Sequence, residues 1–263
     1  MIWLKVGWRL CVTGGSFAVF GLCGVLFSIC AFPLTYFWPH RLRQYCVTRL
    51  VQMFFRALLA TLRLLGVMQL ELTGVEILRD SGPTIVVANH PTYLDIVVLL
   101  ALTPRACCVV KGVHWSNPCF WGIVRAAAYI SNADPMKFIE DGARQLDAGY
   151  TLIIFPEGSR SPSANRMHAF SRGFAHIALK SRRPILPVLM HCEPPFLTKQ
   201  MRWYEIPPFP FRISVHVQEP IDIRPHAAIS HVSPSHSARV VTNTVEVSIT
   251  RQLFDYGFFK AGN

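Results

Sequence analysis

Two short motifs in this chain combine residue types that can carry out acid–base chemistry and hold an anion. The first runs from Asn89 to Asp95 and contains a histidine, His90, with a carboxylate five residues further on. The second is Phe155-Pro156-Glu157-Gly158-Ser159-Arg160-Ser161, which sets a carboxylate, a glycine and an arginine in one turn. Each motif follows a short apolar run, and open α/β sheets bind their ligands at the carboxyl ends of strands. We therefore expect one site, suited to moving an acyl group onto a hydroxyl.

The spacing of the first motif predicts a histidine in a turn paired with a carboxylate on a helix. Residues five apart do not share a helix face, so His90 must precede the helix and Asp95 must come from its first turn. A carboxylate on one ring nitrogen makes the other more basic. The chain has no G-x-S-x-G elbow, so His90 is expected to activate the acceptor's own hydroxyl, without an acyl-enzyme. The same spacing also fits an ordinary turn histidine beside an aspartate that stabilises a helix N-terminus.

The second motif predicts a sharp turn that can bind an anion. Gly158 permits the turn, and Arg160 can engage two phosphate oxygens at once. Glu157 can orient that arginine or bind an acceptor hydroxyl. A salt-bridged surface turn would fit the same residues. The motif is not a P-loop, because G-x-x-x-x-G-K is missing, so ATP and GTP are not expected as ligands.

Apolar periodicity predicts alternating strands and helices after residue 67. The expected strands are Gln69–Thr73, Thr84–Ala88, Ala106–Lys111, Thr151–Phe155, Ile185–Leu189 and Ile213–Gln218. The expected helices are Tyr93–Leu102, Pro118–Ala127, Met136–Ala148, Gly173–Lys180 and Ser237–Leu253. This alternation is typical of an α/β fold with a mixed, mostly parallel sheet flanked by helices. Residues Glu193–Arg212 hold five prolines and are expected to form an irregular loop.

Composition favours a membrane over nucleic acid as the partner of this basic chain. The formal charge is +11 and 51% of the residues are hydrophobic. The basic residues are not gathered into one polar run, and no zinc-finger spacing is present, so no nucleic-acid partner is expected. The eight cysteines form no C-x-x-C pair, which favours buried free thiols in a reducing compartment.

The first 66 residues are expected to form N-terminal membrane-anchor helices, ahead of a catalytic domain over residues 67–263. No charged residue occurs from Leu10 to Pro39, a stretch long enough to cross a bilayer. In Arg43–Gly66, arginines spaced by seven would form a narrow stripe on a helix with a broad apolar face. A core helix with a solvated arginine face is the alternative. More basic residues follow the first segment than precede it, which places the catalytic domain on the cytoplasmic side.

At these motifs the chain resembles the lysophospholipid acyltransferase superfamily, of the PlsC-like 1-acyl-sn-glycerol-3-phosphate acyltransferase type. The resemblance rests on the H-x-x-x-x-D motif at His90, on Phe155–Ser161 and on Ile185-Leu186-Pro187-Val188, and it covers roughly residues 67–220. It implies the glycerolipid acyltransferase fold and acyl transfer from acyl carrier protein or acyl-coenzyme A to a lysolipid hydroxyl. It also implies an N-terminal membrane anchor, with the enzyme in the bacterial inner membrane.

The resemblance also assigns roles to residues. His90 would be the base, Asp95 its orienting partner, and Lys111 a cation near the reacting carbonyl that stabilises the oxyanion. The residues that would bind the acceptor or its phosphate are Glu157, Gly158, Ser159 and Arg160, with Arg172 as a further positive charge. A lysine at a strand end in solvent is the alternative for Lys111. No metal and no resident cofactor are expected, because the thioester is itself a co-substrate.

One departure from the family pattern bears on the acceptor. Where the family commonly has an arginine between the two motifs, this chain has Asn132, followed by Asp134. A carboxylate close to a phosphate would repel it, which leaves room for a less anionic acceptor. The sequence thus predicts a membrane-bound O-acyltransferase for a lysophospholipid. The alternatives are a non-phosphatidate acceptor (an amino-acid lipid, a glycolipid or an aryl-polyene-type product), a catalytically silent lipid-binding protein, and a thioesterase.

Overall fold

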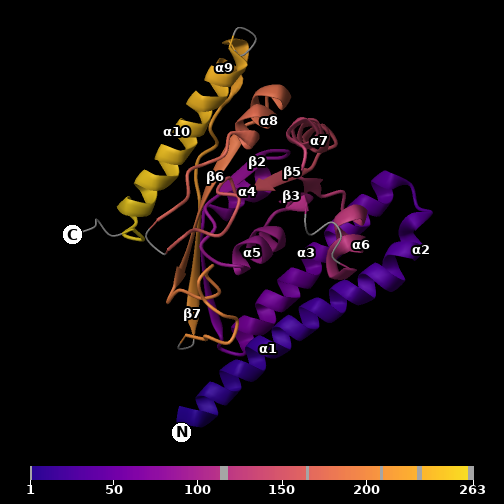
Figure 1. Ribbon diagram of the computed structural model, residues 1–263, viewed down its shortest axis with the longest axis vertical. Coiled ribbons are helices and arrows are strands. Elements are labelled where there is room, and N and C mark those ends of the chain that lie inside the picture. The colour runs from indigo at the N-terminus through magenta and orange to yellow at the C-terminus, as the bar shows by residue number, and fades with distance from the viewer. Residues whose placement is uncertain (1, 113–117, 164–165, 208–209, 230–232, 260–263) are drawn as a thin grey trace.

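The described residues are built on a seven-stranded sheet that lies between helices (Figure 1). The computed structural model describes residues 2–112, 118–163, 166–207, 210–229 and 233–259. The strand order is β1-β7-β6-β2-β5-β3-β4. The strands are β1 Met68–Thr73, β2 Ile85–Ala88, β3 Ala106–Val110, β4 Ile130–Ser131, β5 Thr151–Ile154, β6 Ile185–Glu193 and β7 Phe211–Val217. All neighbouring pairs are parallel except β6 with β7, which confirms the mixed, mostly parallel sheet.

Strand β2 lies in the middle of the sheet and is buried along its whole length. Its residue Ile85 pairs with Leu152 of β5 on one side and with Ile185 of β6 on the other. Such strands read as continuous Val/Ile runs because helices cover both faces of a parallel sheet. The next residues after β2 and β5 are the two motifs, so the sheet itself brings them to one edge.

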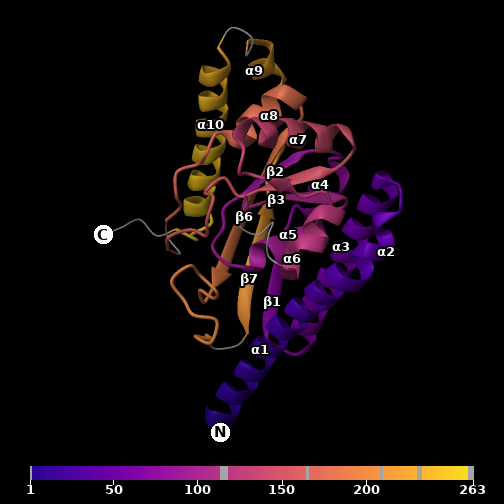
Figure 2. The same ribbon diagram turned by 45° about the vertical axis from the view of Figure 1, so that its right-hand side comes forward.

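Helices cover the sheet in layers (Figure 2). Helices α7 Pro135–Asp147, α8 Gly173–Ser181 and α10 Pro234–Asp255 pack together, while α5 Leu94–Leu102 packs against α3 His40–Leu64. The remaining helices are short: α4 Val75–Asp80, α6 Pro118–Ala126 and α9 Arg224–Ile229.

The N-terminal helices form a hairpin beside this body (Figure 1). Helix α1 covers Ile2–Leu26 and continues through a π-helical turn, Phe27–Ala31, into α2, Phe32–Tyr36. The π-turn ends two residues before Pro33, whose ring and missing N–H disturb the regular hydrogen-bond ladder. Pro39 precedes the first residue of α3, as expected for a residue that ends one helix and starts the next.

Helices α1 and α3 expose unusual amounts of apolar surface. Gly7–Ile29 and His40–Leu64 are both long and apolar enough to cross a membrane. On α1, Phe17 and Leu22 are exposed. Helix α3 is different on its two sides: Val47 and Phe55 belong to the buried core, while the arginine stripe faces solvent. One face of this helix therefore joins the core, and the rest of the helix stays exposed.

The predicted elements agree with the structure except for the shortest ones. Strand β4 and helices α4 and α9 were not predicted, because two to six residues carry too little periodicity. Strand β6 runs four residues beyond the predicted Leu189, to Glu193, where β7 pairs with it in antiparallel register. The expected irregular loop is confirmed between these two strands.

Candidate active site

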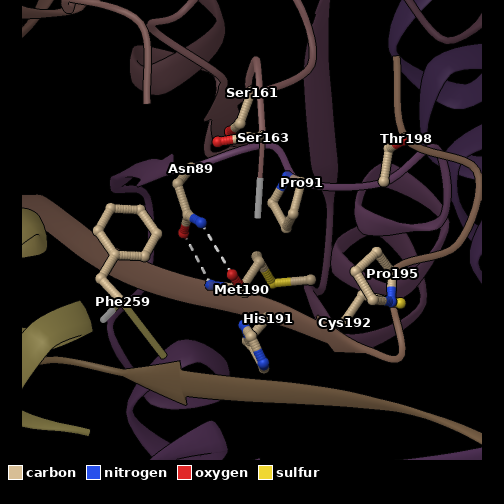
Figure 3. Close-up of a pocket in the computed structure, with 10 residues that line it drawn as sticks. All are labelled: Asn89, Pro91, Ser161, Ser163, Met190, His191, Cys192, Pro195, Thr198 and Phe259. Atoms are coloured by element: carbon tan, nitrogen blue, oxygen red, sulfur yellow. Dashed lines mark hydrogen bonds between the residues drawn. The ribbon is translucent and has the colours of Figure 1, made fainter. Parts of the chain in front are cut away.

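Asn89 joins the first motif to the neighbouring strand. The β2–β6 ladder ends at Ala88 paired with Val188. Beyond it, the Asn89 side chain replaces the backbone: its Nδ2 donates to the carbonyl of Met190 and its Oδ1 accepts from the Met190 amide, both at 2.8 Å. Figure 3 shows this double hydrogen bond. Because Asn89 is buried, the backbone that enters the His90 turn is held in place.

His90 and Asp95 form the predicted pair. The Nδ1 of His90 lies 2.9 Å from the Oδ2 of Asp95, which also accepts a 2.8 Å hydrogen bond from the Thr92 amide. Asp95 lies in the first turn of α5, as the spacing requires. With Nδ1–H donating to the carboxylate, Nε2 is left as the basic nitrogen.

This pair is buried and packs on an aromatic ring. Asp95 is fully buried and the His90 side chain is 15% exposed. The imidazole stacks on the Phe155 ring at 4.1 Å between centroids. Burial raises the pKa of the Asp95 carboxyl, and the hydrogen bonds from His90 and from the Thr92 amide oppose that rise. A buried carboxylate of this kind holds an imidazole in one tautomer and stabilises its protonated form.

Glu157 connects the second motif to the first. Its Oε1 accepts from the His90 amide at 2.9 Å and from the Ser161 hydroxyl at 2.8 Å, and its Oε2 accepts from the His168 amide at 2.8 Å. The Ser161 amide in turn donates to the His90 carbonyl at 2.8 Å. Glu157 is buried, so its carboxylate is committed to holding these segments together.

Arg160 is directed toward the loop that follows β6. Its Nη1 donates to the carbonyls of Leu197 and Thr198, at 2.8 and 2.7 Å. Its guanidinium carbon lies 3.9 Å from the centre of the Tyr93 ring. Gly158 has a φ of +67°, which explains the glycine in the turn. The Ser159 hydroxyl donates to the Arg160 carbonyl at 3.2 Å.

Two other predicted residues lie on the exposed surface. Lys111 follows β3, which is separated from β2 only by β5, and Arg172 occupies the residue before α8. Within the described part of the chain, neither contacts His90. The structure thus brings together His90, Asp95 and Glu157, and leaves Lys111 and Arg172 outside the buried network.

The segment that departs from the family pattern lies beside Lys111. Ser131 pairs with Val110 at the end of β3, and the next residue, Asn132, is exposed. Asp134 has a structural role, since its carboxylate accepts from the Met136 and Lys137 amides and caps α7. Its charge is therefore already directed at a helix N-terminus.

A small pocket lies behind the two motifs (Figure 3). Its lining includes Asn89, Pro91, Ser161, Cys192 and, from the C-terminal segment, Phe259. Burial raises the pKa of the Cys192 thiol to about 12, so at neutral pH this cysteine is a thiol and not a nucleophilic thiolate. Among the described residues, no group of three or more His, Cys, Asp or Glu side chains is arranged to hold a metal ion.

Sequence reasoning missed the partners of these groups. Asn89 was visible only as a member of the motif, while its bond to Met190 joins residues 101 apart. Tyr93 was assigned no role, yet its ring packs on Arg160. The backbone targets of Glu157 and Arg160 leave no trace in a single sequence, because any residue type supplies an amide or a carbonyl.

Known proteins share both the sequence and the fold of this site. A family profile described as Acyltransferase matches residues 69–191. The chain is 34% identical over 114 residues to a 1-acyl-sn-glycerol-3-phosphate acyltransferase of Cocos nucifera, covering 40% of this chain and 36% of that protein. It is 26% identical to the alpha form of Mus musculus, over 63% of this chain and 59% of that protein. For the Helicobacter pylori enzyme of the same name the identity is 28%, over 45% and 54%.

The chain thus spans less than two thirds of the length of these curated relatives. A solved structure adds the fold: the 1-acyl-sn-glycerophosphate (LPA) acyltransferase PlsC of Thermotoga maritima has a TM-score of 0.69 at 20% identity, covering 97% of this chain and 98% of that one. Residues 69–191, which include both motifs, thus match the acyltransferase family, and the chain shares the fold of PlsC over nearly its whole length.

Proposed function

We propose that this protein is a membrane-bound O-acyltransferase that moves a fatty acyl group onto the hydroxyl of a lysophospholipid such as 1-acyl-sn-glycerol 3-phosphate. The observation that carries the proposal is the 2.9 Å contact between His90 Nδ1 and the buried Asp95 carboxylate. It leaves Nε2 as a base at the carboxyl end of the central strand. The relatives named above are acyltransferases for such an acceptor.

In the reaction, the acyl group moves from the thioester sulfur to the acceptor oxygen, and the hydroxyl proton moves to the sulfur. His90 Nε2 takes the proton of the acceptor hydroxyl while its oxygen attacks the thioester carbonyl. The tetrahedral intermediate then collapses, the C–S bond breaks, and the thiolate leaves with the proton that His90 returns. Asp95 stabilises the imidazolium between these two steps. The products are an oxygen ester and a free thiol.

The donor is the thioester of an acyl carrier protein or of coenzyme A, and no resident cofactor is required. Lys111 is proposed to stabilise the oxyanion: it lies two strands from β2, roughly 10 Å across the sheet, on a long flexible stem. Gly158, Ser159 and Arg172 are proposed to bind the acceptor near the turn. Arg160 contributes through its remaining N–H groups, since Nη1 is engaged by carbonyls.

The proposed location is the bacterial inner membrane, with the catalytic domain facing the cytoplasm. The exposed apolar surface of α1 and the outward face of α3 support membrane attachment. The excess of basic residues after the first apolar segment supports the orientation.

One observation favours a second acceptor class. The position where the family commonly carries an arginine is the exposed, neutral Asn132. A phosphate there would gain no charge-assisted hydrogen bond, so a phosphate-free lysolipid is the second candidate acceptor.

Acyl transfer by the purified, detergent-solubilised chain tests the proposal. Labelled acyl-carrier protein and acyl-coenzyme A are offered with lysophosphatidic acid or a phosphate-free lysolipid, and ester and free fatty acid are both measured. His90→Ala should abolish ester formation, whereas His236→Ala, on the exposed side of α10, should not. Release of free fatty acid alone would identify a thioesterase. No turnover with any acceptor would favour a silent lipid-binding protein.

A further inference from the structure

The loop between β6 and β7 connects the second motif to the N-terminal helix. We call residues Leu197–Ile206 the aromatic loop. It follows the carboxyl end of β6, the same edge of the sheet that carries His90. In both views it lies beside the N-terminal half of α1 (Figure 1, Figure 2).

The base of the aromatic loop is fastened to both motifs. The Leu197 carbonyl accepts from the Tyr93 amide at 3.3 Å and from Arg160 at 2.8 Å. The Gln200 side chain donates to the Pro162 carbonyl at 3.1 Å. Leu197 itself is buried and adopts a φ of +51°, a backbone conformation that needs such support. Hydrogen bonds therefore tie the base of the loop to both motifs.

The tip of the loop presents aromatic rings to solvent. Trp203 is 53% exposed and Tyr204 is 44% exposed, and their rings meet edge to face at 5.8 Å. The Arg202 guanidinium lies 5.8 Å from the Tyr204 ring and donates to its hydroxyl. A turn in which the Glu205 amide donates to the Arg202 carbonyl at 3.0 Å fixes this arrangement.

The tip also contacts helix α1. A Cβ added to Gly14 would lie 3.7 Å from Cζ3 of the Trp203 ring, so the indole packs on the helix where no side chain intervenes. On the same helix Leu10 and Phe17 are exposed. Trp203 therefore extends the apolar surface of α1 toward the edge of the sheet that carries His90.

From this continuity we propose that the tip of the aromatic loop is a second membrane contact, which lies at the headgroup and glycerol level of the bilayer that holds α1. The proposal rests on the proposed membrane attachment of α1. Trp and Tyr suit this depth because each combines an apolar ring with a hydrogen-bonding group. Lys199 and Arg202 place two positive charges beside the rings against the one negative charge of Glu205, and this balance favours anionic headgroups. Through Arg160, the lipid surface thereby sets the position of the turn that follows β5.

Fluorescence quenching tests the location of Trp203 directly. The full-length chain is placed in vesicles of phosphatidylcholine and phosphatidylglycerol, with or without chains brominated near the glycerol. The chain has six tryptophans, so the Trp203 signal is the difference between wild type and Trp203→Phe. We expect that difference signal to be quenched by brominated lipid. An unquenched signal from vesicle-bound protein would overturn the proposal, as would failure of the chain to bind vesicles.

A kinetic experiment tests the consequence. Trp203→Ala/Tyr204→Ala should raise the KM for lysolipid presented in vesicles roughly tenfold, and leave turnover of detergent-dispersed lysolipid unchanged. Val247→Ala, at a 64% exposed position on α10, is the control. Equal loss in vesicles and detergent would overturn the membrane role and indicate a structural one. Because quenching needs no turnover, an inactive enzyme would not obscure it.

Discussion

The two motifs contain similar residue types, yet the structure uses them differently. In the first, one ring nitrogen of His90 is held by the Asp95 carboxylate, and the other, Nε2, is the base we propose. In the second, Glu157 and the Nη1 of Arg160 are directed at backbone amides and carbonyls. The first motif is thus the one we propose to take part in the reaction, and the second largely holds the first in place.

This difference changes what a charged residue in a motif implies. A buried carboxylate with three donors is a structural centre, because removing one partner leaves a desolvated polar group behind. A buried carboxylate on an imidazole is costly to the fold and useful to the reaction. Substitutions in the two motifs should therefore separate activity from stability.

His90→Ala should give the largest effect. Without the base, kcat should fall by about 10³-fold, within the range for removed acid–base catalysts. The free energy of unfolding should fall by only about 1 kcal/mol, because the buried Asp95 carboxyl loses one hydrogen-bond partner and keeps the Thr92 amide. Steady-state kinetics and urea unfolding on the same preparation measure both. Activity above a tenth of wild type would refute the base role.

Asp95→Asn should lower kcat by about 10²- to 10⁴-fold through the wrong tautomer of His90. Stability should hold or rise. The folded-state pKa of Asp95 is raised above its ordinary 3.8, so its contribution to stability is present below that value and lost as the pH rises through the raised pKa. At neutral pH the carboxyl therefore costs stability, and a variant that unfolds more readily than wild type would contradict this.

Glu157→Gln should show the opposite pattern. One of three donors would face the amide NH₂, and the free energy of unfolding should fall by about 2 kcal/mol. Activity should fall only to the extent that the turn loosens. Because a bound acceptor stabilises the folded protein, adding acceptor should restore activity and stability together. Glu246→Gln is the matched control, because Glu246 accepts one long hydrogen bond, from the Phe170 amide at 3.4 Å. Lost activity at unchanged stability would assign Glu157 a chemical role.

Arg160→Lys tests whether Arg160 supports the neighbouring loop or binds the acceptor phosphate. A lysine cannot reproduce the flat contact with Tyr93 together with the hydrogen bonds to Leu197 and Thr198. We expect kcat/KM to fall roughly tenfold, and equally for phosphate-bearing and phosphate-free acceptors. A loss confined to phosphate-bearing acceptors would show that Arg160 binds phosphate.

The smallest expected effect is a pH dependence of the free energy of unfolding, caused by two histidines outside both motifs. Burial lowers the pKa of His191 and of His216. The His191 ring stacks on Phe258, and the His216 ring lies tilted against Tyr256. Their contribution to stability is present above the unfolded-state pKa of about 6.5 and is lost as the pH falls through the lowered folded-state values.

The free energy of unfolding should thus drop between pH 7.5 and 5.5. His216→Phe should reduce this drop, while His236→Ala should not. Glu71, Glu193 and Arg212 also face this cluster, and their substitution should change the slope less. An unchanged slope in His216→Phe would place the proton uptake elsewhere.

Local patterns were enough to predict most of the fold and the contact between His90 and Asp95. The run before His90 is continuous Ile and Val because β2 is covered on both faces, and the five-residue spacing has one geometric solution. The antiparallel pairing of β7 with β6 and the hydrogen-bond acceptors of Arg160 could not be predicted, because they depend on segments that are distant in sequence. Asp134 was considered only for its charge, and the structure adds that its carboxylate caps α7.

The buried face of α3 has a practical consequence for producing this protein. Val47, Val51 and Phe55 belong to the same core as α5, the helix that carries Asp95. A shortened chain that starts at residue 67 would uncover that face of α5 and aggregate in water. A water-soluble form should instead keep α3 and replace the outward-facing Leu50 and Met53 with polar residues.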